Sequence, residues 1–222
     1  GPDKEKVSRF ALAMYQGMEK AGIGACYKHF PGHGDTDTDS HLGLPVINKT
    51  KEELISEELY PFAKGIKAGI DMIMVGHLAA PALSNGKTIP ASISKEIITD
   101  LLKEEMGFKG IVVSDLGAIK YLQTTHYVTD SPKESIRQAI AAGVDMQFYD
   151  FTNEFWQQTI IELVNEKKLT MEQIDRAAGG VLRLKFLLGL FENNHFAALV
   201  ATFSIILTAI YSIWLYNKKI TQ

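Results

Sequence analysis

Three of the six histidines and three aspartates lie within residues 28–41, which read Lys-His-Phe-Pro-Gly-His-Gly-Asp-Thr-Asp-Thr-Asp-Ser-His. The segment follows an apolar run at 23–27 that is typical of a short strand. Pro31, Gly32 and Gly34 disfavour regular structure, so we expect the polar side chains to lie on a loop that leaves the end of this strand. A loop so rich in titratable groups, next to a strand, indicates a reaction site.

A metal site is the first chemistry that this loop could support. Every second residue from Asp35 to Asp39 is an aspartate, as at the start of an EF-hand calcium loop. That loop also needs glycine at position six and glutamate at position twelve, where this chain has Ser40 and Val46. A transition-metal site would need ligands from other strands, and His77 is the one candidate ligand there. The sequence therefore favours a site without metal.

Acid–base and nucleophilic chemistry is the second possibility. Asp39 and His41 are two residues apart, so the carboxylate can orient the imidazole and raise its basicity. Asp115 ends a run of β-branched residues, where its carboxylate would point into the mouth of a site. Carboxylate nucleophiles are typical of retaining glycosidases, which form a covalent glycosyl-enzyme. An equally simple role for Asp115 is to cap a helix that starts at Leu116.

Amphipathic helices alternate with apolar strands along the part of the chain that must position these residues. Helical spacing of apolar residues predicts helices at 6–21, 52–68, 94–106, 132–142, 154–166 and 171–188. Strands are predicted at 23–27, 70–77, 110–115 and 144–148. The strands are apolar almost throughout, which is typical of parallel strands buried on both faces.

Repeated βα units with polar residues at the C-terminal ends of the strands are the pattern of a (β/α) barrel or of an open doubly wound sheet. No glycine-rich nucleotide fingerprint follows a predicted strand, which disfavours a nucleotide-binding sheet. A complete (β/α)8 barrel has eight units and roughly 250 residues, and this chain has about four units. We therefore expect an α/β fold that corresponds to half of a TIM-type barrel.

The composition is that of an ordinary globular domain, with a net charge of −3 and 46% hydrophobic residues. The chain has no basic patch with interleaved aromatic residues, so we expect no nucleic-acid partner. Cys26 is the single cysteine, which excludes an internal disulfide and a cysteine-rich zinc site.

The C-terminal segment differs from the rest because residues 196–216 carry no charge. Such a helix could cross about 30 Å of hydrocarbon, with Trp214 and Tyr216 at the interface. We therefore predict a barrel domain over 1–193 and a transmembrane helix with a short basic tail over 194–222. Lys218 and Lys219 would lie on the cytoplasmic side, which leaves the barrel membrane-anchored on the non-cytoplasmic side. The alternative is a buried core helix.

The loop at 28–36, together with Asp-Ser-His at 39–41, resembles the signature loop of glycoside hydrolase family 3 in its β-N-acetylglucosaminidase branch. The resemblance covers nearly all of residues 1–193. It implies that they form the C-terminal half of the family's N-terminal (β/α)8 barrel, with four strands expected upstream. It also implies a carbohydrate substrate and no cofactor.

The resemblance implies a role for each residue that matches the motif. The histidine of the Asp-Ser-His element is the acid/base and the aspartate two residues before it is its partner, which correspond to His41 and Asp39. The nucleophile of the family lies in a Ser-Asp pair at a strand end, which corresponds to Asp115. The substrate-binding residues implied by the same loop are Lys28, His29, His33 and Asp35.

Two departures leave the substrate open. After the Ser-Asp pair this chain has Leu116, Gly117 and Ala118, which resembles the Ser-Asp-Trp-Gly-Ala of family 3 β-glucosidases with leucine for the sugar-stacking tryptophan. Residues 142–146 and 182–193 also resemble the glucosidase branch. Since the loop carries the acid/base pair, we expect a retaining β-N-acetylhexosaminidase that removes terminal N-acetylglucosamine.

The alternatives are a β-glucosidase, a phosphorylase, and an inactive membrane-anchored sugar-binding remnant. Phosphorolysis is considered because a neutral His41 would repel an incoming phosphate less than a carboxylate would. The remnant is considered because half a barrel lacks the sugar contacts of the other half. Residues 1–222 alone are expected to have little glycosidase activity.

Overall fold

The computed structural model describes residues 3–36, 39–40 and 42–188. The chain divides into one unit, Gly1–Leu182, and a second, Arg183–Gln222, of which residues 183–188 are described. The predicted domain boundary at 193 and the predicted membrane span at 196–216 therefore lie outside the described residues. Within the described ranges, no helix is long and apolar enough to cross a membrane.

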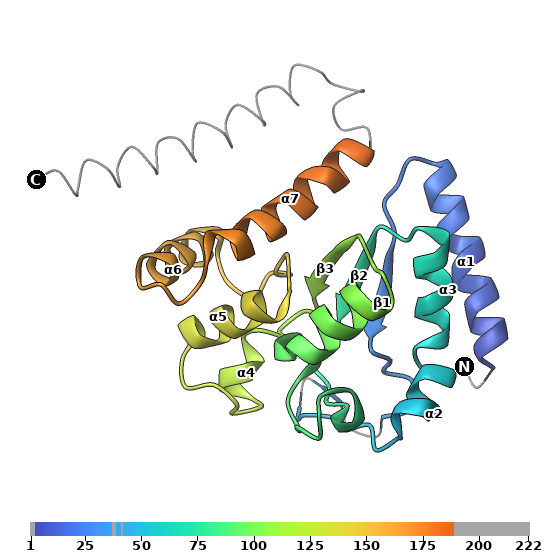
Figure 1. The fold of residues 1–222 in the computed structure, drawn as a ribbon, viewed down its shortest axis with the longest axis horizontal. Helices are drawn as coiled ribbons and strands as arrows, with labels where there is room; N and C mark the ends of the chain where they lie inside the picture. Colours follow the sequence, from blue (N-terminus) through green and yellow to red (C-terminus); the bar gives the residue numbers. More distant parts are fainter. Residues whose placement is uncertain (1–2, 37–38, 41, 189–222) are drawn as a thin grey trace, which may run out of the picture. The chain divides into compact units, whose positions relative to one another are not determined.

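A parallel sheet organises the first unit, and in the described residues it has three strands in the order β1-β2-β3 (Figure 1). The strands are β1 (Cys26–Phe30), β2 (Met72–Val75) and β3 (Ile111–Ser114). Val75 pairs with Phe30 on one side and with Ser114 on the other. The C-terminal ends of the strands therefore meet at one edge of the sheet, and the predicted parallel α/β architecture is confirmed.

The first strand lies later in the chain than its sequence predicts, at Cys26–Phe30 in place of 23–27. The preceding residues are engaged elsewhere: the Ile23 N–H donates back to helix α1 at 2.9 Å, and the Ala25 N–H donates to the Asp71 carboxylate at 3.1 Å. As a consequence, the first polar residues of the predicted loop, Lys28 and His29, belong to the strand itself.

Helices α1 (Lys4–Lys20) and α3 (Tyr60–Ala68) lie side by side next to β1 (Figure 1). The prediction of one helix over 52–68 is wrong, because α2 (Lys51–Ser56) ends before α3 begins. Pro61 explains the break. It has no N–H to donate to the carbonyl of residue 57, and its ring would clash with that carbonyl in a continuous helix.

The helices predicted at 94–106, 132–142, 154–166 and 171–188 are present to within a few residues, whereas three short helices at 81–83, 91–93 and 121–124 were not predicted. Ser94 lies just before the helix at 96–105, and its Oγ accepts the Ile97 N–H at 3.3 Å. That helix is of the π type, since the Met106 N–H donates to the Leu101 carbonyl. The remaining elements are η1 (Pro81–Leu83), η2 (Ala91–Ile93), η3 (Glu96–Glu105), α4 (Tyr121–Thr124), α5 (Pro132–Ala142), α6 (Asn153–Asn165) and α7 (Met171–Leu187).

The prediction of a fourth strand over 144–148 is wrong in its extent, because only Met146 forms a parallel bridge, to Val113. The side chain of Asp145 accounts for the difference. Its Oδ2 accepts the Val112 N–H at 2.9 Å. In a longer strand, a backbone carbonyl would accept this N–H instead. Lys103 lies 2.9 Å from the same carboxylate and keeps this buried charge paired.

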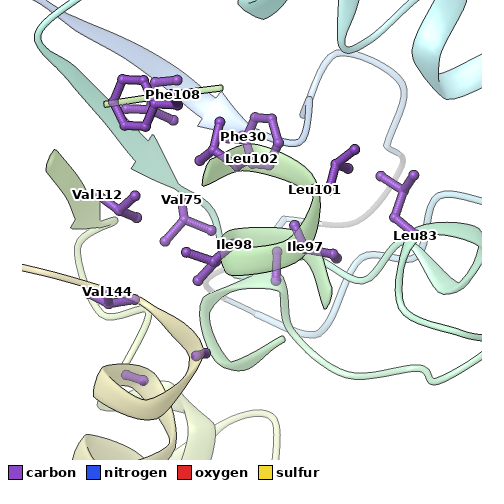
Figure 2. Packing of buried hydrophobic residues seen from close by; sticks show 14 of the residues in the cluster. Phe30, Val75, Leu83, Ile97, Ile98, Leu101, Leu102, Phe108, Val112 and Val144 are labelled. Carbon is purple, nitrogen blue, oxygen red and sulfur yellow. The ribbon is translucent and has the colours of Figure 1, made fainter. Parts of the chain in front are cut away.

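Part of the core lies between η3 and the sheet, and Figure 2 shows Ile98 and Leu102 of η3 close to Val75 and Phe30. These four side chains are fully buried. Burying an aliphatic or aromatic side chain of this size contributes about 1.5–3 kcal/mol, so the ends of β1 and β2 are held rigidly by the core. The polar residues that follow these strands are therefore presented on a fixed frame.

Candidate active site

Side chains from three neighbouring strands meet at the C-terminal edge of the sheet. Asp115 follows β3, and its Oδ2 lies 3.4 Å from His29 Nε2 and 3.8 Å from His77 Nε2. His29 is on β1, and His77 follows β2. The Asp115 side chain is 12% exposed, and those of His29 and His77 are 26% and 0% exposed. The carboxylate is therefore mostly shielded from water and faces two imidazoles.

A third histidine lies behind this group. His126 Nε2 lies 3.0 Å from His77 Nδ1, so one ring donates a hydrogen bond to the other. If His77 presents an Nε2–H to Asp115, its Nδ1 must accept, and His126 must be the donor. In that arrangement His126 fixes both the tautomer and the orientation of His77, and neutral rings suffice to present a donor to the carboxylate.

The two oxygens of Asp115 have different surroundings. Oδ1 accepts the N–H of Leu116 at 2.8 Å, while Oδ2 faces the histidines. The backbone is held as well, because the Asp115 N–H donates to the Val75 carbonyl at 3.0 Å. Asp115 does not cap a helix at Leu116, because α4 begins only at Tyr121. Its bond to the Leu116 N–H lies within a turn.

The turn after Asp115 depends on a glycine. Gly117 has φ of 80°, a left-handed conformation that side chains disfavour, and an added Cβ would lie 2.4 Å from Cε2 of Tyr121. The Ala118 N–H donates to the Asp115 carbonyl at 3.1 Å and closes the turn. The glycine that follows Leu116 in the sequence therefore has a direct structural cause.

Asp150 also contacts this turn. Its Oδ2 accepts the Ile119 N–H at 3.2 Å and lies 3.5 Å from Ser114 Oγ. Burial raises the pKa of Asp150 to about 6, although hydrogen bonds from backbone N–H groups and Ser114 oppose this shift. Its other oxygen is buried and has no hydrogen-bond partner among the described residues.

The loop after β1 is folded back on itself by His33. Its Nδ1 lies 2.6 Å from Thr36 Oγ1 and its Nε2 lies 3.2 Å from Ser40 Oγ. The rings of His29 and His33 meet edge to face with centroids 6.0 Å apart. The predicted sugar contact of His33 stays a prediction, and in this structure the ring nitrogens of His33 bond within the loop.

A lysine that the sequence did not single out anchors the same loop. Lys49 Nζ lies 2.9 Å from Asp35, 2.8 Å from Glu57 and 2.6 Å from Glu58. These carboxylates raise the pKa of Lys49 above its ordinary range, mainly through its hydrogen bonds to Glu57 and Glu58. Asp35, predicted to bind substrate, is therefore tied to the segment between α2 and α3.

The predicted acid/base pair is only partly described. Asp39 is exposed, and its carbonyl accepts the N–H groups of Leu42 and Gly43 at 2.9 and 3.1 Å. His41 lies outside the described residues, so its distance from Asp39 and Asp115 stays untested. Lys28 is exposed near the end of β1.

A cavity of about 1320 Å³ lies along β1, where the sheet ends in the described residues. It is bounded by α1, β1 and the following loop, and its lining includes Lys28, His29, His33, Asp35 and Lys49. The predicted substrate-binding residues therefore share one open space. No group of three or more histidine, cysteine, aspartate or glutamate side chains in the described ranges is arranged to hold a metal ion.

Sequence reasoning placed His29 and Asp115 together at the strand ends but missed His126, Asp150 and Lys49 as parts of the site. His77 was singled out only as a metal ligand. Its position directly after an apolar strand was the available signal, because parallel strands bring their C-terminal residues together. The other three lie on loops, and no spacing in the sequence links them to Asp115.

A parallel α/β fold with a carboxylate and histidines at the C-terminal edge of its sheet is typical of barrel and open-sheet enzymes. Residues 1–184 match the model of the glycosyl hydrolase family 3 N-terminal domain. The chain belongs to this family, and the family predicted from the sequence is confirmed.

Relatives from both branches of the family are similar to this chain. It is 31% identical to the β-hexosaminidase A of Pseudoalteromonas piscicida over 81% of its length, and 32% identical to the periplasmic β-glucosidase of Salmonella typhimurium over 76%. The solved family 3 β-N-acetylglucosaminidase of Paenibacillus sp. str. FPU-7 matches 82% of the chain at 33% identity, with a TM-score of 0.73. The chain spans only 32%, 20% and 34% of these three proteins.

Proposed function

We propose that this chain carries the catalytic half of a retaining glycosidase that removes terminal β-linked N-acetylglucosamine. The observation that supports this most directly is Asp115: a shielded carboxylate at a strand end, with one oxygen facing His29 and His77. A glycosyl-enzyme requires a carboxylate that is held in place and protected from bulk water.

The chemistry divides between Asp115 and His41. In the first step Asp115 bonds to the anomeric carbon while the bond to the leaving oxygen breaks, and His41 gives its proton to that oxygen. In the second step His41 takes a proton from water, whose oxygen attacks the anomeric carbon and releases Asp115. Two inversions give net retention. Asp39 orients His41 throughout and favours its protonated form.

The described fold fits the C-terminal half of a (β/α)8 barrel. Three strands and the bridge at Met146 account for one side of such a ring, and β1 is left at the edge of the sheet. The open cavity along β1 is where further strands would pair. Because sugar contacts from those strands would be absent, the 222-residue chain alone should turn over substrate poorly.

The second candidate is a β-glucosidase, and Leu116 is the observation that favours it. This residue directly follows Asp115 and is 48% exposed, so it can contact a sugar bound at the carboxylate. The proposed N-acetylglucosamine specificity depends instead on the loop that carries the acid/base pair. Comparing activated aryl glycosides of the two sugars separates these candidates.

A chimera provides the test of function. Residues 1–184 of this chain replace the matching segment of the Pseudoalteromonas β-hexosaminidase A, and hydrolysis of aryl N-acetylglucosaminide and aryl glucoside is measured. We expect turnover of the first substrate, labelling of Asp115 by a mechanism-based fluorosugar, and a loss of several orders of magnitude in Asp115→Asn. A chimera that folds by circular dichroism and melts cooperatively but is labelled at another residue would refute the assignment.

We also propose that residues 196–216 anchor the protein, with the catalytic unit on the non-cytoplasmic side. The support is the length and lack of charge of the segment, followed by Lys218 and Lys219. Protease added to intact cells should then digest the catalytic unit and spare the tail. Recovery of the whole chain in the soluble fraction would overturn this proposal.

A further inference from the structure

Asp150 is a buried carboxylate that the proposed mechanism does not use. It is 8% exposed and lies shortly after the bridge residue Met146, on a different segment from Asp115. Its location close to the proposed nucleophile is therefore a product of the fold. Burying a carboxylate costs free energy, so a buried Asp150 indicates either a function or a compensating network of hydrogen bonds.

The hydrogen bonds of Asp150 bracket Asp115 along the chain. Oδ2 accepts the Ile119 N–H at 3.2 Å on one side of Asp115 and lies 3.5 Å from the Oγ of Ser114 on the other. The same Ser114 hydroxyl accepts the Phe148 N–H at 3.0 Å, which returns the network to the segment that carries Asp150. Both ends of the Asp115 turn are thus tied to one buried group.

We propose that Asp150 is a positioning residue that holds the turn from Ser114 to Ile119 and thereby fixes where the Asp115 carboxylate points. The proposal rests on the proposed function for its catalytic meaning, because Asp115 must be the nucleophile for its position to matter. We propose no substrate contact for Asp150, because its Oδ2 contacts are with the Ile119 N–H and Ser114 Oγ. Its effect on the reaction is transmitted through the backbone of residues 115–119.

The protonation state of Asp150 should modulate this hold. An ionised carboxylate accepts stronger hydrogen bonds from N–H groups than a neutral acid does. The ionisable side chains on the segments that contact Asp150 are Asp115 and Lys120 on the turn and exposed Tyr149 beside it. In the described residues Asp150 makes no ion pair, so burial and the hydrogen bonds of the turn govern its titration.

The first test uses the 222-residue chain and does not depend on catalysis. In an Asp115→Asn background, which leaves no ionisable side chain at position 115, the amide resonances of Leu116 and Ile119 are followed by NMR across pH 4.5–8. We expect both to shift with one midpoint near the pKa of about 6 given above for Asp150. Asp150→Asn should remove this transition, and the same substitution at exposed Asp175 should leave it intact. A Leu116 amide that does not respond at this midpoint would overturn the proposal.

The second test measures catalysis in the chimera. Asp150→Ala should lower kcat on the order of 10²-fold with little change in KM, since a misplaced nucleophile weakens the transition state more than substrate binding. Asp150→Asn keeps an oxygen that can accept the Ile119 N–H, so it should restore much of kcat while losing the pH transition near 6. Equal losses in kcat and 1/KM, or no rescue by Asn, would contradict a positioning role. An inactive parent chimera would count against the proposed function and leave the NMR result to decide the positioning.

Discussion

Replacing Asp150 by asparagine should change how the stability of this protein depends on pH. The pKa of Asp150 rises from 3.8 to about 6 on folding because burial disfavours its charged form. Between these values the native state binds more protons than the unfolded state, so stability falls as pH rises through the window. Ionised Asp150 therefore destabilises the fold at neutral pH, whereas an amide has no proton to lose.

The size of the effect follows from the shift. Relative to a protein in which Asp150 stays protonated, ionisation lowers the unfolding free energy by about 3 kcal/mol at pH 7.5, where the full difference of about 2 pKa units applies. At pH 4.5 the unfolding free energy is lowered by only about 1 kcal/mol. The unfolding free energy of Asp150→Asn relative to the parent should therefore increase by about 2 kcal/mol between these pH values. Any constant difference in hydrogen bonding or packing cancels in this comparison.

Urea denaturation at four pH values between 4.5 and 7.5 measures this difference, with Asp175→Asn as the matched control. Asp175 lies on an exposed position of α7, so the same substitution there should leave the pH dependence unchanged. If the difference between Asp150→Asn and the parent changes by less than about 0.5 kcal/mol across this range, the reasoning about burial is refuted.

Three further substitutions address the site. Gly117→Ala should destabilise the chain by about 1–3 kcal/mol in urea denaturation, because φ of 80° and the ring of Tyr121 both oppose a Cβ; an unchanged midpoint would contradict the described turn. His41→Ala in the chimera should spare activated aryl glycosides and strongly impair disaccharides, which need protonation of the leaving oxygen; equal losses on both would count against the acid/base role. Leu116→Trp should raise the ratio of glucoside to N-acetylglucosaminide turnover severalfold, since an aromatic ring stacks on a sugar face; an unchanged ratio would show that Leu116 does not contact the sugar.

The parallel fold could be predicted because its signals are local. Apolar strands and amphipathic helices alternate along the chain, and Ser131 and Thr152 cap α5 and α6 where the sequence suggests helix starts. Errors occurred where a single side chain changed the outcome. Pro61 divides a predicted helix, and the Asp145 carboxylate takes a backbone donor that a fourth strand would have used.

The site was predictable only where the chemistry lies next to a strand. Asp115 and His29 are at strand ends, so the parallel topology alone brings them to one edge. Asp150 and His126 reach the site through turns whose direction depends on backbone conformation, and residue type alone does not encode that direction. A buried carboxylate in an irregular segment gives no periodic signal, so the contact of Asp150 with the turn could be found only from the folded structure.

The two histidines that face Asp115 are not equivalent, and their exposure separates their roles. His29 is 26% exposed and lines the open cavity, so under the proposed function it can contact a sugar hydroxyl and Asp115 at the same time. His77 is fully buried, and its other ring nitrogen is engaged by His126, so it can act on the sugar only through Asp115. Oδ2 of Asp115 thus lies near one histidine that is open to the cavity and one that is fully buried. Oδ1 of Asp115 accepts the Leu116 N–H, and Asp150 accepts the Ile119 N–H of the same turn. The Asp115 carboxylate is therefore restrained by contacts from several parts of the fold, as the proposed attack along one line requires.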